Sequence, residues 1–188
     1  MTLTGFKARN HPQQTLVHGP RVDVDERGTP PELFAALDRR FRFTIDVAAL
    51  PHNRKCTRYF APPAPRPWGC MWEVECLPVA VDGLRQPWHG ERVWCNPPYS
   101  NIRPWVEKAT QEWGLGRGVG AELIVMLLPA NRTEQAWWQE LVEPYRDRAG
   151  SIGLHVEFLA GRFAFDTGSK VANSRPPFGC CLLIWGGS

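Results

Sequence analysis

The sequence predicts a single α/β domain, with helices packed on a central, mostly parallel β-sheet. The strongest observation is the continuous apolar run Leu123–Pro129, which is typical of a strand buried on both faces of a parallel sheet. Residues 33–41 and 102–113 carry apolar side chains at helical spacing, as expected of helices that cover such a sheet. A chain of 188 residues is long enough to bury a core of this kind in one domain.

The start of the chain predicts an arm followed by a capped helix. Residues 1–20 are polar and aperiodic, which indicates a flexible arm before a folded domain of residues 21–188. A helix is expected to begin at Thr29-Pro30, because threonine can cap a helix and proline suits the first helical position. The apolar face of this helix is formed by Leu33, Phe34, Leu37 and Phe41.

The first strand of the sheet is predicted within Phe43–Ala49, where apolar side chains alternate before a run of small residues. Asp46 falls near the carboxyl end of this strand. Ligands of open α/β sheets bind outside the carboxyl ends of strands, so we expect Asp46 to face a ligand. The alternative is a capping or solvated aspartate.

A second strand is predicted to end at Cys95, directly before Asn96-Pro97-Pro98-Tyr99. The two prolines prevent the strand from continuing and make the segment stiff. The side-chain carbonyl of Asn96 and the backbone carbonyl of Pro97 are acceptors that can hold one amino group, and Tyr99 can stack on the flat ring that bears it. This combination indicates methyl transfer to a planar NH2 group; the alternative is a proline-stiffened turn with a core tyrosine.

The second half of the chain completes the α/β pattern. A helix capped by Ser100 or Asn101 is expected after the NPPY segment. The apolar strand then leads into another helix, which places Arg132 at the carboxyl end of a strand, where it can face a substrate. Two final strands are predicted at residues 155–159 and 179–185.

Taken together, these segments resemble the phage-type DNA N6-adenine methyltransferases, the phage Dam family, which depend on S-adenosylmethionine. The segments occur in the family's order from about residue 28 to residue 185, so the set is more specific than the NPPY motif alone. The matching segments are Thr29–Phe34, Asp46–Ala49, Asp82–Leu84, Trp94–Ser100, Leu127–Ala130 with Trp137-Trp138, and Gly161–Phe163 with Pro177-Phe178.

The resemblance implies a fold and an activity. The expected fold is the single-domain Rossmann-like methyltransferase fold, in which the last two strands form an antiparallel hairpin. The implied reaction transfers the methyl group of S-adenosylmethionine to N6 of adenine in DNA, with the adenine flipped out of the base stack. The family also implies a protein encoded by a phage or prophage that acts in the cytoplasm of a bacterial host.

The resemblance also assigns roles to individual residues. The expected catalytic residues are Asn96, Pro97, Pro98 and Tyr99. The expected contacts with the cofactor are Thr29, Pro30, Asp46, Ala48, Asp82 and Asn96. Ala48 and Ala49 stand where other cofactor-binding methyltransferases carry a glycine-rich loop.

The candidate contacts with DNA are aromatic and basic side chains. Tyr99 is expected to stack on the target base, and Arg132 is expected at the end of a strand. Arg58 belongs to a basic segment for which a solvated short helix is the alternative. Arg162 and Lys170 lie between the last two strands, where a purely structural hairpin is the alternative.

Residues 61–80 depart from the family pattern, which passes quickly from Tyr59-Phe60 to Asp82. The prolines between residues 61 and 68 exclude regular structure, so we predict a loop insertion. A plain surface loop and a part in target recognition are both open.

Composition excludes some classes of protein. The net charge of +3 permits a polyanionic partner without requiring one. The absence of a long apolar run and of a signal pattern predicts a soluble cytoplasmic protein. The six cysteines are expected to be reduced thiols, and the lack of a CxxC pair predicts no metal. The alternative is a zinc site formed from His52, Cys56, Cys70, Cys76 and His89.

Two other functions remain open on the sequence. NPPY also occurs in enzymes that methylate a glutamine side chain or an RNA base. The missing glycine-rich loop leaves room for a non-catalytic relic that binds nucleic acid without binding the cofactor.

Overall fold

The computed structural model describes residues 25, 28–63, 77–116, 118–147, 153–166, 176 and 178–186. The predicted arm at 1–20, most of the predicted loop at 61–80, and Lys170 lie outside these residues. The elements in chain order are α3 (Pro31–Phe41), β1 (Ile45–Asp46), β2 (Phe60–Ala61), β3 (Ala80–Val81), β4 (Arg92–Cys95), α4 (Arg103–Gly114), β5 (Leu123–Pro129), α5 (Ala136–Leu141), β6 (Leu154–Phe158) and β7 (Cys180–Trp185).

The main sheet of the described residues has the strand order β1-β4-β5-β7-β6. β1 pairs in parallel with β4, and β4 pairs in parallel with β5. β7 runs antiparallel to both of its neighbours, β5 and β6. The predicted α/β fold, with a mostly parallel sheet and an antiparallel pair at the carboxyl end, is therefore confirmed.

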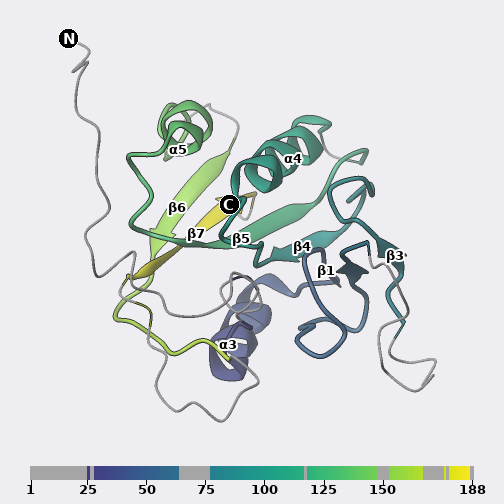
Figure 1. Ribbon diagram of the computed structural model, residues 1–188. Helices are drawn as coiled ribbons and strands as arrows, with labels where there is room; N and C mark the ends of the chain where they lie inside the picture. Colours follow the sequence, from purple (N-terminus) through teal and green to yellow (C-terminus); the bar gives the residue numbers. More distant parts are fainter. Residues whose placement is uncertain are drawn as a thin grey trace.

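The helices cover both faces of this sheet, as Figure 1 shows, with α3 on one side and α4 and α5 on the other. Successive side chains of β5 alternate between the two layers. Ile124, Met126 and Leu128 pack with α4 and α5, while Val125 and Leu127 pack with α3. Every residue of β5 is buried, which is why its sequence is continuously apolar.

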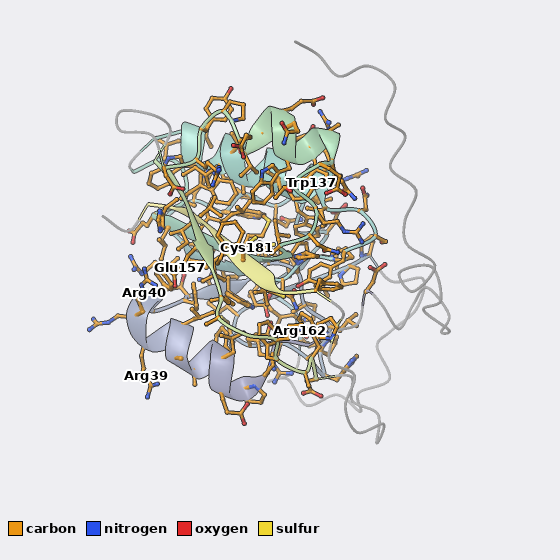
Figure 2. The ribbon with its side chains drawn as sticks, turned by 90° about the vertical axis from the view of Figure 1, so that its left-hand side faces the viewer. Arg39, Arg40, Trp137, Glu157, Arg162 and Cys181 are labelled. Carbon is orange, nitrogen blue, oxygen red and sulfur yellow. The ribbon has the colours of Figure 1, made fainter. Side chains whose placement is uncertain are left out.

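An ion pair ties α3 to the edge of the sheet. Arg40 Nη1 lies 2.7 Å from Glu157 Oε2 on β6, and Figure 2 shows the two side chains next to each other. Trp137, on α5, lies across the sheet from this pair in the same view. The pair is partly exposed, so its main effect is on orientation and its contribution to stability is small.

Both predicted helix caps are wrong. α3 begins at Pro31 after Pro30, and Thr29 makes no capping hydrogen bond because its side chain is buried in the wall of a cavity. α4 begins after Ile102, since Ser100 is held instead by the carboxylate of Asp25. The Ser100 hydroxyl is thus taken by a tertiary contact, whereas the Thr29 hydroxyl is buried with no partner among the described residues.

A second, two-stranded parallel sheet flanks β1. β2 pairs with β3, and Asp46 N–H donates to the Arg58 carbonyl at 3.0 Å, which joins the small sheet to β1. Ala61 and Ala80 are therefore paired strand residues, so the predicted loop begins later and ends earlier than 61–80. No helix of the described residues is long and apolar enough to cross a membrane.

Candidate active site

A cavity of about 510 Å³ opens at the carboxyl ends of β1 and β4. This volume lies in the range of small-molecule sites. Its wall is assembled from segments that are far apart in the chain: residue 25 with 28–29, residues 46–50 with 53 and 55, residues 60–63, residues 82–84, and β4 with the loop and helix that follow it.

The residues chosen from the sequence converge on this cavity. Thr29, Asp46, Ala48, Asp82 and Asn96 all line it. The remaining expected cofactor contact, Pro30, does not line it and instead precedes α3.

Asp46 is a buried carboxylate in this wall, with 3% of its surface exposed. Its Oδ2 accepts from the backbone N–H of Lys55 at 3.0 Å and its Oδ1 from that of Ala48 at 3.3 Å. Burial raises the pKa of Asp46 to about 6, although the two backbone hydrogen bonds and the charge of Lys55 oppose this shift. The group is therefore mostly ionised at neutral pH and suited to bind a cationic amine.

The NPPY segment leaves the sheet as predicted, directly after β4. Asn96 and Pro98 line the cavity, while Pro97 is buried beside them. Tyr99 is half-buried and packs edge-on against two rings, at centroid distances of 5.9 Å to Phe165 and 6.3 Å to Phe178. The segment thus lines the cavity through Asn96 and Pro98 and packs its aromatic ring against two phenylalanines.

Two buried polar atoms in the cavity wall have no hydrogen-bond partner within the described part of the chain: Thr29 Oγ1 and Trp94 Nε1. Buried polar atoms are nearly always paired, and leaving one unpaired costs about 1–3 kcal/mol. Both atoms are therefore candidates to pair with a polar ligand. Sequence reasoning missed Trp94; the available signal was that Trp94 alternates with the core residues Val93 and Cys95.

The opposite wall depends on a glycine. A Cβ atom on Gly83 would lie 2.1 Å from the carbonyl oxygen of Val47, so only glycine permits this approach. Trp88 Nε1 donates to the Gly83 carbonyl at 2.9 Å, and Trp88 N–H donates to buried Glu112 at 3.1 Å. This chain of contacts anchors the Asp82-Gly83 turn on α4.

The basic candidates for DNA contact differ in their surroundings. Arg132 is half-buried just beyond β5, and its Nε has no partner among the described residues. Arg162 is exposed and lies on the α3 side of the sheet (Figure 2). Arg58 forms an ion pair of 2.6 Å with Glu91.

Among the described residues, no group of three or more His, Cys, Asp or Glu side chains is placed to hold a metal ion. Cys70 and Cys76, two members of the alternative zinc set, lie outside those residues. Burial raises the pKa of Cys56 to about 12, so its thiol stays protonated at neutral pH.

A comparison with protein families decides the family. The model of the DNA N-6-adenine-methyltransferase (Dam) family matches residues 75–185, which is more than half of the chain. The chain belongs to this family.

Individual relatives agree with the Dam assignment. The DNA N-6-adenine-methyltransferase of Escherichia phage T1 is 30% identical over 159 residues, which are 79% of this chain and 57% of the relative. The chain thus spans little more than half the length of that protein. The enzyme of the same name from Haemophilus phage HP1 is 23% identical, over 84% of this chain and 77% of the relative.

A solved structure from Pyrococcus horikoshii, provisionally assigned as an RNA methyltransferase, superposes with a TM-score of 0.48 at 11% identity. The superposition covers 90% of this chain and 89% of that one.

The Dam match includes Asp82, Trp94 and Asn96 but begins after Thr29 and Asp46. The tertiary structure places residues from inside and outside the matched range on one cavity.

Gly83→Ala tests the packing of the cavity wall. The added methyl group must displace the end of β1, so we expect the free energy of unfolding to fall by about 1–3 kcal/mol in urea denaturation. Gly114→Ala is the matched control, because a Cβ there meets no atom within 4 Å. Equal stability of the two variants would contradict the close approach of Gly83 and Val47.

Proposed function

We propose that this chain transfers a methyl group from S-adenosylmethionine to N6 of adenine in DNA. Membership of the Dam family supports the reaction class. The observation that carries the proposal is that Asn96, from the NPPY segment, lines the same cavity as Asp46 and Thr29. Asn96, which is suited to hold the adenine amine, thus shares one site with Asp46 and Thr29, which are suited to hold S-adenosylmethionine.

The cavity fits the proposed cofactor. The amino-acid part of S-adenosylmethionine carries an ammonium and a carboxylate, and the wall offers the Asp46 carboxylate for the first. The unpartnered Thr29 hydroxyl and Trp94 N–H suit the second. Asp82, beside Gly83 on the opposite wall, is suited to accept hydrogen bonds from the adenosine half.

When bound, S-adenosylmethionine supplies an electrophilic methyl group. Asn96 and the Pro97 carbonyl orient the adenine amine by accepting its hydrogens. No strong base is required, because the amine can lose its proton after it is alkylated. The protein's main contribution to rate is then the alignment of two reactants.

Tyr99 is proposed to stack on the flipped adenine, with Phe165 and Phe178 holding its ring in place. Among the basic side chains, Arg132 is the strongest candidate to contact DNA, because it lies half-buried just beyond the carboxyl end of β5, at the same edge of the sheet as the cavity. Arg58 is a weak candidate, since its charge is already paired with Glu91.

Asn96→Ala tests the proposed reaction. We expect N6-methyladenine formation to fall by about 10²–10³-fold, while binding of S-adenosylhomocysteine changes little. Purified protein is incubated with unmethylated DNA and S-adenosylmethionine, and the digested DNA is analysed by mass spectrometry. Gln111→Ala, which removes an exposed amide on α4, is the control that retains activity.

Other outcomes of that assay point elsewhere. A variant that still methylates DNA well would refute the role of Asn96. A wild-type protein that binds the cofactor but leaves DNA unmodified would redirect the search to RNA or glutamine side chains. Failure to bind the cofactor at all would favour the non-catalytic alternative.

The affinity for S-adenosylhomocysteine is expected to depend on pH through Asp46. Burial raises the pKa of this carboxyl from 3.8 to about 6, so the ionised form that binds an ammonium is present above pH 6 and is lost below it. Calorimetry should show constant affinity between pH 7 and 8 and a loss approaching tenfold per unit below 6. Methylthioadenosine, which lacks the amino-acid group, should show no such loss; a parallel loss for both ligands would contradict the assignment.

Trp94→Phe tests the proposed carboxylate contact. It removes the N–H but keeps a ring that can pack against Phe34 and Phe43. A hydrogen bond to a charged group contributes about 1.5–3 kcal/mol, so S-adenosylhomocysteine should bind at least about tenfold more weakly. Trp185→Phe is the matched control, because Trp185 Nε1 is also buried without a partner among the described residues, yet Trp185 does not line the cavity. Equal affinities of the two variants would exclude Trp94 as a donor.

A further inference from the structure

Asp25 lies far from the NPPY segment in sequence and contacts it directly in the structure. One oxygen of its carboxylate accepts from the backbone N–H of Ser100 at 3.0 Å, and the other accepts from the Ser100 hydroxyl at 2.6 Å. Asp25 also lines the cavity. Ser100 follows Tyr99, so this double hydrogen bond holds the far end of the NPPY segment.

The same part of the chain is anchored a second time, a few residues further on. Gly28 and Asp166 exchange two backbone hydrogen bonds, of 2.7 and 2.9 Å, as an antiparallel bridge. Thr29, with its unpartnered hydroxyl in the cavity wall, comes next. Asp25 and Gly28 therefore connect the NPPY segment with the wall proposed to hold the cofactor.

The NPPY segment needs such an anchor. Its start is fixed by β4, but its two prolines have no N–H to donate to the rest of the protein. At its end, the Asn101 N–H donates to the Pro98 carbonyl, which closes a turn without attaching that turn elsewhere. The Ser100 contacts with Asp25 attach this end to the chain before α3, in addition to the packing of the Tyr99 ring on Phe165 and Phe178. Hydrogen bonds to a carboxylate are stronger than neutral ones.

We propose that Asp25 is a positioning residue for the methyl transfer. This proposal rests on the proposed function of the site. By holding Ser100, it fixes the NPPY segment against the wall that carries Thr29, and so keeps the target amine in line with the bound cofactor. A misplacement of about 1 Å in reacting groups can lower a rate by about 10²-fold, so the contact matters for turnover more than for stability.

The test is a double-mutant cycle on turnover. Asp25→Ala and Ser100→Ala should each lower kcat by about 10–100-fold, and the double variant should be no slower than the slower single variant. Affinity for S-adenosylhomocysteine should stay within about threefold of the wild type. Ser100→Thr keeps both donors and should retain most of the activity.

A second readout does not depend on activity. In hydrogen exchange, Asp25→Ala should remove the protection of the Ser100 amide, whereas the amides of β5 should stay protected and so report an intact fold. If the wild type methylates no DNA, the proposed function fails, yet this measurement still tests the contact between Asp25 and Ser100.

Three results would overturn the proposal. The first is additive effects of the two substitutions on kcat. The second is a large loss of cofactor affinity with unchanged kcat, which would make Asp25 a cofactor contact. The third is unchanged protection of the Ser100 amide in Asp25→Ala.

Discussion

The parallel pairing of β1 with β4 is the contact on which the candidate site depends. It sets Asp46 opposite Trp94, and Val47 N–H donates to the Trp94 carbonyl at 3.1 Å. Because both strands run in the same direction, their carboxyl ends open at the same edge of the sheet. Asp46 and the loop that begins at Asn96 therefore face one cavity.

Placing Asp46 in that position has a cost. Its pKa is raised from 3.8 to about 6, so the folded protein holds the proton more tightly than the unfolded chain does. Stability therefore falls as the pH rises from about 4 to about 6, by about 3 kcal/mol for a shift of this size. A cationic amine bound beside the carboxylate would offset part of this loss, which couples ligand binding to the stability of the site.

The cavity is formed by the NPPY segment together with supporting segments from elsewhere in the chain. The NPPY segment, which is proposed to hold the target amine, is stiff, but its stiffness comes from prolines that cannot donate hydrogen bonds. The surrounding chain supplies what the motif lacks: Asp25 holds its end, and Gly83 allows the opposite wall to approach β1. The range matched by the Dam family model includes the NPPY segment, whereas the full cavity also requires residues before that range.

Several features of this protein were determined by the sequence alone. The run Leu123–Pro129 matches β5 residue for residue, because a strand buried on both faces has no polar positions. The apolar positions of α3 followed from helical spacing, and the end of β4 followed from two prolines. The residues expected at the cofactor site also lie together, apart from Pro30, although their roles stay predictions.

Only the tertiary structure decided which polar side chains meet. Thr29 and Ser100 both have good local capping propensity, yet the Thr29 hydroxyl is buried with no partner among the described residues and the Ser100 hydroxyl binds Asp25. Likewise, only the fold shows that Trp94, a buried strand residue, lines the cavity and has an Nε1 without a partner among the described residues. The physical reason is that helix and strand patterns arise from neighbours in sequence. A hydrogen-bond partner, in contrast, is often a residue far away in the sequence that the packing of the fold brings to within about 3 Å.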